Sequence, residues 1–163
     1  NVLSQVYLSQ KHHDRAIPEA ERALALDPNY ADGYADLGLF LTYAGRPEET
    51  IELVEKAMRL NPRYPAYYSW TLGQAHLLTG RYAEGISALK VSLIRNPDFL
   101  HVHIDLVLAY SETGQDREAQ TAVAEVLRIS PSFSLGAAEQ ILPFRDPAVL
   151  ERFLAALRKA RLT

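Results

Sequence analysis

Histidine and aspartate side chains are the groups in this sequence that could do chemistry, and one pair has a suggestive spacing. His101 and Asp105 lie four residues apart, so on a helix they share one face. Such a pair could contribute to a metal site or to a hydrolase. His103 is two residues from His101 and falls on a different face. A metal-dependent hydrolase is therefore a remote alternative.

The other candidate groups favour structural roles. His76 takes a position that is large in the neighbouring repeats described below, which favours a buried structural histidine. His12 and His13 are adjacent, and we expect them on a solvated turn that begins the next helix with Asp14 as its N-cap. The chain has no cysteine, no G-x-S-x-G motif and no phosphate-binding glycine loop. We predict that it is no enzyme and holds no cofactor or metal.

Paired helices would position these residues, and residues 31–62 show the pattern most fully. Apolar residues recur there at three- and four-residue steps in two series, Tyr34, Leu37, Leu41 and Ala44, then Ile51, Val54, Ala57 and Met58. Each series predicts an amphipathic helix. Gly45 suits the residue that ends the first helix, and Pro47 suits the first turn of the second. The segment predicts a helical hairpin that cannot bury its apolar faces alone.

The same unit recurs along the chain. The prolines that close the units are spaced by 34, 35 and 34 residues, and they are Pro28, Pro62, Pro97 and Pro131. A leucine stands 25 residues before each of them, at Leu3, Leu37, Leu72 and Leu106. Gly38 and Gly73 each follow one of these leucines. Because glycine inside a helix costs about 1 kcal/mol relative to alanine, we expect close approach of the partner helix to offset that cost.

This period and pattern resemble the tetratricopeptide repeat (TPR) over roughly residues 2–131. The resemblance implies an all-α, TPR-type solenoid, a right-handed superhelix of antiparallel helix pairs. We predict four hairpins in residues 1–131, the first truncated at its start. Residues 132–163 then add a short degenerate helix and a C-terminal helix from Pro147, N-capped by Asp146, which covers the last apolar face.

The C-terminal part carries a finer resemblance. The segment LPFRDP (142–147) and the following LERFLAALRKA (150–160) look like the TPR tails of bacterial class III adenylate/guanylate cyclase-type proteins. The resemblance implies a parent protein with a catalytic or signalling domain before this fragment. The cyclase motif residues are not in this chain, so no cyclase activity is expected of it. The start at Asn1, inside the first helix, also suggests a piece of a longer protein.

The resemblance also implies where a partner would bind, because the first helix of each TPR hairpin lines an inner groove. The residues of that helix that point away from its partner helix include Asp32, Ala35, Asp36, Leu39, Tyr43, Tyr67, Trp70, Gln74, His101, Asp105 and Leu108. Gln5 and Leu8 extend the set in the first repeat, and Glu112 extends it in the fourth. Whether Trp70 and Tyr67 face the groove or pack between repeats is open at this stage.

The predicted groove is aromatic, apolar and acidic. TPR domains that capture a C-terminal carboxylate resemble one another in using Lys, Arg and Asn there, and the matching places in this chain are Asn1, Gln5, Asp36, Tyr67 and Thr71. A carboxylate ligand is therefore not expected. An amphipathic or basic segment of a partner fits better, which predicts a protein-interaction scaffold. Self-association through the open N-terminal edge is the alternative.

Composition excludes several other classes of protein. The formal net charge of −3 gives no basic surface for nucleic acid. No apolar run approaches the roughly 20 residues that span a bilayer, and no signal peptide is visible. We therefore expect a cytoplasmic protein whose partners are proteins or peptides, with neither nucleic acid nor membrane among them.

Overall fold

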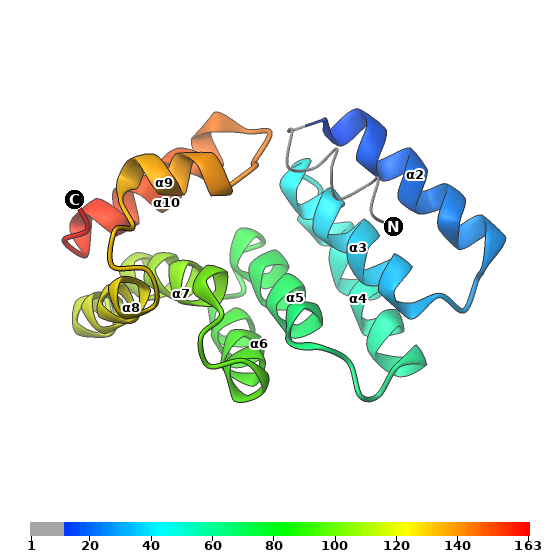
Figure 1. Ribbon diagram of the computed structural model, residues 1–163, viewed down its shortest axis with the longest axis horizontal. Coiled ribbons are helices and arrows are strands. Elements are labelled where there is room, and N and C mark those ends of the chain that lie inside the picture. The colour runs from blue at the N-terminus through cyan, green and yellow to red at the C-terminus, as the bar shows by residue number, and fades with distance from the viewer. Residues whose placement is uncertain (1–11) are drawn as a thin grey trace.

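The computed structural model describes residues 12–163, and every regular element in that range is a helix (Figure 1). The helices are α2 (His13–Leu26), α3 (Ala31–Tyr43), α4 (Pro47–Leu60), α5 (Ala66–Leu78), α6 (Tyr82–Arg95), α7 (Leu100–Glu112), α8 (Asp116–Ile129), α9 (Leu135–Ile141) and α10 (Pro147–Lys159). The all-α class is confirmed. Predictions that concern Leu3, Gln5, Leu8 and the other residues before His12 lie outside the described range.

Three helical hairpins form the body of the molecule: α3 with α4, α5 with α6, and α7 with α8. The predicted turn glycine Gly45 has a φ angle of 88°, and its counterparts Gly80 and Gly114 have φ angles of 78° and 74°. Glycine adopts this left-handed conformation without steric cost, so the chain can reverse in the three residues between paired helices. In the first hairpin, the Arg46 N–H donates to the Leu41 carbonyl oxygen at 2.8 Å and closes the helix end.

The interior glycines do mark close approach between paired helices, as expected. A Cβ added to Gly38 would lie 2.9 Å from Val54 Cγ2, and one added to Gly73 would lie 2.8 Å from Leu89 Cγ. Thr50 Oγ1 uses the same proximity, donating to the Gly38 carbonyl oxygen at 2.7 Å. The small residue therefore permits both tight packing and a hydrogen bond between the two helices.

Replacing Gly73 with alanine is expected to destabilise the protein in spite of the better helix propensity of alanine. The new methyl group would press on Leu89, which is fully buried, and on the Gly85 carbonyl oxygen at 3.1 Å. Overpacking of this kind costs about 1–3 kcal/mol. Gly136→Ala in α9 is the matched control, because its Cβ would meet only Ser134 Oγ at 3.8 Å. Urea unfolding should show opposite signs for the two variants; equal effects would contradict the packing argument.

The start of α2 differs from the sequence prediction. The N-cap is His12, not Asp14, and Asp14 lies in the first turn, where it pairs with Arg145 near the other end of the chain. Pro18 lies inside the helix, beyond its first turn. His12 is exposed, but His13 is buried at 3% exposure, so the expectation that both sit on a solvated turn is wrong for His13.

After α8 the repeat ends. α9 stops at Ile141 and an extended segment follows. Asp146 caps α10 as predicted, with its carboxylate accepting from the Ala148 N–H at 2.8 Å and Pro147 in the first helical position. α10 packs against α7 and α9, with Phe153 and Leu157 fully buried. The proposed division of the chain at residue 131 stays a prediction.

Candidate functional site

The first helices of the three hairpins, α3, α5 and α7, lie side by side along the inner side of the molecule (Figure 1). The predicted groove residues are on these helices, and their exposure falls into two groups. Asp32 is exposed, and Leu39, Tyr67 and His101 are partly exposed. The others are buried: Ala35, Asp36, Tyr43, Trp70, Gln74, Asp105 and Leu108. We call the inner side of α3, α5 and α7 the concave face.

Polar contacts between neighbouring helices explain much of this burial. Trp70 Nε1 donates to Asp105 Oδ2 at 2.7 Å, and Gln74 Nε2 lies 3.3 Å from both Asp105 oxygens. The Trp70 ring packs against Phe99 and His101, with centroids 5.2 and 5.3 Å apart. Trp70 therefore packs between repeats. Burial raises the pKa of Asp105 to about 7, although the two donors favour its ionised form.

The end of the concave face near the start of α3 and α5 is acidic and rich in tyrosine. The Tyr68 hydroxyl donates to Asp32, and the rings of Tyr67 and Tyr68 meet edge to face at 4.9 Å. Burial raises the pKa of Asp36, and the neighbouring Asp32 carboxylate acts in the same direction. Burial also raises the pKa of Tyr67, followed by the effect of the Asp36 charge. This end offers negative charge beside aromatic surface, with Asp32 exposed.

The opposite end of the concave face is covered by the chain's own residues 142–149, which we call the clasp. The Phe144 ring lies 4.8 Å from the Tyr43 ring and 5.1 Å from the Phe153 ring. The Arg145 N–H donates to the Tyr43 carbonyl oxygen at 2.9 Å. In Figure 1 this segment extends from α9 across to the end of α3. Tyr43 is therefore buried by the C-terminal part of the chain.

α10 makes further charged contacts, one to the end of α7 and one to the start of α8. Arg152 Nε and one terminal nitrogen donate to the two Glu112 oxygens at 2.9 and 2.8 Å. Lys159 Nζ lies 2.8 Å from Asp116 Oδ1. The sequence pattern indicates Glu112 as a groove residue but gives no sign of its partner, nor of the roles of Phe144 and Arg145. The LPFRDP motif was the available signal, because its phenylalanine stands just before a helix cap.

The residues considered for catalysis do not converge. Asp105 bonds to Trp70 and Gln74, while His101 lies against Trp70 and Phe99. His103 Nε2 is 2.9 Å from the Pro97 carbonyl oxygen, and His76 is 9% exposed, with its pKa lowered by burial. Within residues 12–163 no group of three or more histidine, aspartate or glutamate side chains could hold a metal ion.

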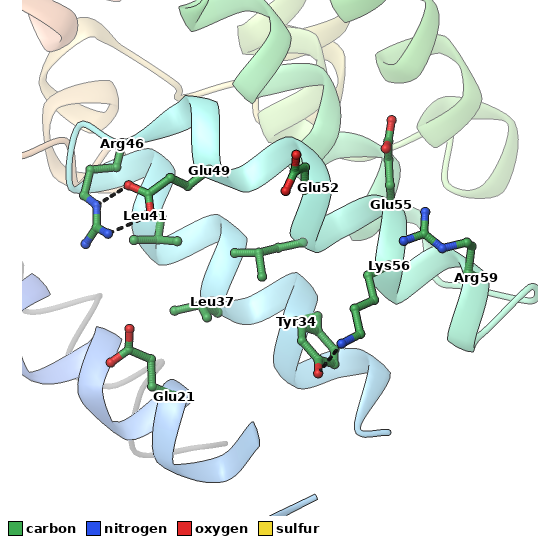
Figure 2. Close-up of a pocket in the computed structure, with 11 residues that line it drawn as sticks. Glu21, Tyr34, Leu37, Leu41, Arg46, Glu49, Glu52, Glu55, Lys56 and Arg59 are labelled. Atoms are coloured by element: carbon green, nitrogen blue, oxygen red, sulfur yellow. Dashed lines mark hydrogen bonds and ion pairs between the residues drawn. The ribbon is translucent and has the colours of Figure 1, made fainter. Parts of the chain in front are cut away.

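A hollow of about 530 Å³, which we call the outer hollow, lies between α2 and α4 over α3 (Figure 2). Its floor is apolar, with Tyr34, Leu37 and Leu41 from α3. Its rim carries charges of both signs. Arg46 binds Glu49 at 2.6 Å, and Lys56 Nζ donates to the Tyr34 hydroxyl at 2.7 Å. A hollow of about 370 Å³ takes the corresponding place over α7, at Leu106 and Tyr110. The two hollows therefore lie at equivalent places in two of the repeats.

Comparison with known proteins supports the repeat assignment. Residues 7–70 match the family described as tetratricopeptide repeat. The chain is 45% identical over 51 residues to small glutamine-rich tetratricopeptide repeat-containing protein 2 of Saccharomyces cerevisiae, covering 31% of this chain and 14% of that protein. It is 29% identical over 151 residues to the mitochondrial ALBINO3-like protein 3 of Arabidopsis thaliana, covering 81% of this chain and 26% of that protein.

Solved structures share the architecture. PilW, a type IV pilus biogenesis factor, superposes with a TM-score of 0.74 at 21% identity, over 98% of this chain and 70% of PilW. A thermophilic TPR protein of Thermus thermophilus gives 0.70 at 23% identity, over 96% and 78%. MamA gives 0.67 at 23% identity, over 96% and 91%. The fold is a TPR-type solenoid. No helix in residues 12–163 is long and apolar enough to cross a membrane.

Proposed function

We propose that this chain is an interaction scaffold that binds an amphipathic or basic segment of a partner protein on its concave face. One observation carries the proposal: the face already accommodates such a segment from the chain itself. The clasp presents an aromatic side chain to Tyr43, and α10 then places Arg152 and Lys159 against Glu112 and Asp116. A surface that accepts an apolar helix with basic residues along its edge has the chemistry to accept another.

The unoccupied part of the face supports the same partner chemistry. Asp32 is exposed, and Tyr67, Leu39 and His101 are partly exposed beside it or on the next helices. Tyrosine and tryptophan dominate binding energy at many interfaces, and carboxylates beside them favour a cationic segment. YrrB, a structural neighbour at 20% identity, is described as a TPR protein with an unusual peptide-binding site. We propose peptide binding here on the residues of this chain, since that likeness shows only the fold.

The parent protein is the finer part of the proposal. We propose that the chain serves as a regulatory or docking part of a larger bacterial signalling protein of the cyclase type, in the cytoplasm. This rests on the resemblance to such tails of residues 142–160, together with the repeat segments 31–41 and 67–82. The chain spans about a seventh to a quarter of the curated relatives described above, so the activities of whole relatives do not carry over. The residues that precede Asn1 in the parent would test the assignment directly.

Charge reversal on the concave face should weaken the binding of a basic peptide. The probes are two short amphipathic helices with the same apolar residues, one bearing lysines and one bearing glutamates. We expect Asp32→Lys to weaken binding of the lysine peptide by about tenfold, which corresponds to about 1.4 kcal/mol. Glu52→Lys on the outer hollow is the matched control, with the same change of net charge. Fluorescence anisotropy measures both.

Two results would contradict this function. One is equal affinity for the lysine and glutamate peptides, and the other is equal loss in the Asp32→Lys and Glu52→Lys variants. Self-association is the second candidate, because Leu26 and Ile94 are 84% and 81% exposed. Light scattering that gives twice the monomer mass, reversed by Leu26→Lys or Ile94→Lys, would favour that candidate.

A further inference from the structure

The chain departs from the repeat pattern at a defined point, just before the clasp. α9 begins 35 residues after α7, which keeps the spacing of the repeats, but it has 7 residues where α7 has 13. Pro143 follows two residues after its end and cannot continue the helix. The chain therefore does not form a further hairpin turn. It extends over the concave face instead and reaches α3, three repeats back.

The surface that the clasp covers, which we call its seat, has the features of a ligand site. Phe144 is 5% exposed and fills the space between Tyr43 and Phe153. One backbone hydrogen bond, from the Arg145 N–H to the Tyr43 carbonyl oxygen, fixes the direction of the segment. The Arg145 side chain reaches Asp14 on α2. An aromatic anchor, a main-chain bond and a cation on a carboxylate together describe how a short extended peptide is recognised.

The contact between the clasp and the repeats leaves more empty space than the contact between the rest of α10 and the core. A hollow of about 190 Å³ separates Thr42 and Leu78 from Val149 and Arg152. The Arg145–Asp14 pair is exposed, with 48% and 89% of the two side chains accessible. Phe153 and Leu157 in the middle of α10 are fully buried in the main core, to which Leu142 and Phe144 of the clasp also belong. The hollow and the exposed ion pair make the clasp the more weakly held part of the C-terminal segment.

We propose that the clasp is an intramolecular ligand of the concave face. The partner that displaces it presents an aromatic residue followed by arginine in an extended segment. The inference rests on the proposed function and adds the partner's chemistry and the way its access is controlled. Because the clasp is tethered, its effective concentration at the Tyr43 seat is about millimolar, so it competes with any partner that lacks a comparable anchor. Partner binding opens the contact between α3 and the C-terminal segment.

The test uses the full chain and a labelled synthetic peptide with the sequence of residues 140–149. Phe144→Ala empties the seat in the protein, so this variant should bind the peptide about tenfold or more tightly than the unchanged protein does. The same peptide with alanine in place of its phenylalanine should lose that affinity. Leu26→Ala, which removes an exposed apolar side chain far from the seat, is the matched control and should bind like the unchanged protein.

A second variant keeps the test decisive if Phe144→Ala does not fold. The chain has no cysteine, so Ala44→Cys with Arg145→Cys can be joined by a short bismaleimide next to the Tyr43–Arg145 hydrogen bond. We expect the cross-linked protein to bind the peptide about tenfold more weakly than the same protein before cross-linking. Equal affinity before and after cross-linking, or no peptide binding in either variant, would overturn the inference. The lysine-peptide experiment at Asp32 would still decide the proposed function, because it probes the other end of the face.

Discussion

Replacing Phe153 with alanine is expected to lower the free energy of unfolding by about 3–5 kcal/mol. Phe153 is fully buried, stacks with Phe144 at 5.1 Å and belongs to the core cluster that includes Ile104 and Leu108 of α7. Truncation therefore removes an aromatic side chain and leaves a cavity that α7 and α10 cannot close. Against a typical domain stability of about 5–15 kcal/mol, this loss would be severe. Chemical denaturation followed by circular dichroism measures it.

The size of the effect tests whether α10 belongs to the solenoid. Leu26→Ala serves as the control, because Leu26 is 84% exposed and surface changes of this kind stay within about 0.5 kcal/mol. A loss below about 1 kcal/mol for Phe153→Ala would mean that α10 is only loosely attached. A loss in the expected range would separate the fixed half of α10 from the clasp, which we infer to be releasable.

The hairpins could be predicted from the sequence because their causes are local. Gly45 ends a helix where only a left-handed residue fits, and the prolines and leucines repeat at a constant spacing. The first helical position of α4 and the cap of α10 agree with the prediction. Each depends on interactions within a few residues. The error at Asp14 is different, since its partner Arg145 is 131 residues away.

The concave face could be predicted only in part, for a related reason. Periodicity identifies which side of α5 and α7 turns away from the partner helix, but not what covers that side. Trp70 and Asp105 bond to each other across two helices, and the clasp covers Tyr43. The first contact depends on how neighbouring repeats stack, and the second depends on the C-terminal segment folding back onto α3. Neither contact is visible in the apolar pattern of a single repeat, so the sequence does not distinguish buried residues of this face from accessible ones.

The Asp105 carboxyl is the buried polar group whose state should depend most on pH. It is fully buried, and its donors are Trp70 Nε1 at 2.7 Å and Gln74 Nε2 at 3.3 Å. Gln74 Oε1 is buried without a hydrogen-bond partner in the described part of the chain. Rotation of that amide exchanges its oxygen and nitrogen, an assignment that depends on the hydrogen-bond network. A protonated Asp105 could then donate to the Gln74 oxygen, so the neutral acid has a place in the fold.

The stability of the protein is therefore expected to fall as pH rises from about 4 to about 7. The folded-state pKa of Asp105 is raised from 3.8 to about 7, so the unfolded chain loses this proton first. Its stabilising contribution is complete below the unfolded pKa and is lost as pH rises through the folded pKa. At 1.36 kcal/mol for each unit of pKa, the total is about 4 kcal/mol, an order-of-magnitude figure. Urea unfolding at a series of pH values measures the slope.

Asp105→Asn isolates this contribution from those of the other acids. Burial also raises the pKa of Asp36, while Arg152 lowers that of Glu112, and both effects remain in the variant. Asparagine keeps the shape, accepts from Trp70 and donates to Gln74, so the variant should match the original protein near pH 4 and exceed its stability near pH 8. Asp27→Asn, at an exposed helix end, should follow the original protein throughout. If the stability curves of Asp105→Asn and the original protein stay parallel across the range, the pKa of the buried carboxyl is not raised in the fold, and the Trp70 and Gln74 hydrogen bonds offset its desolvation.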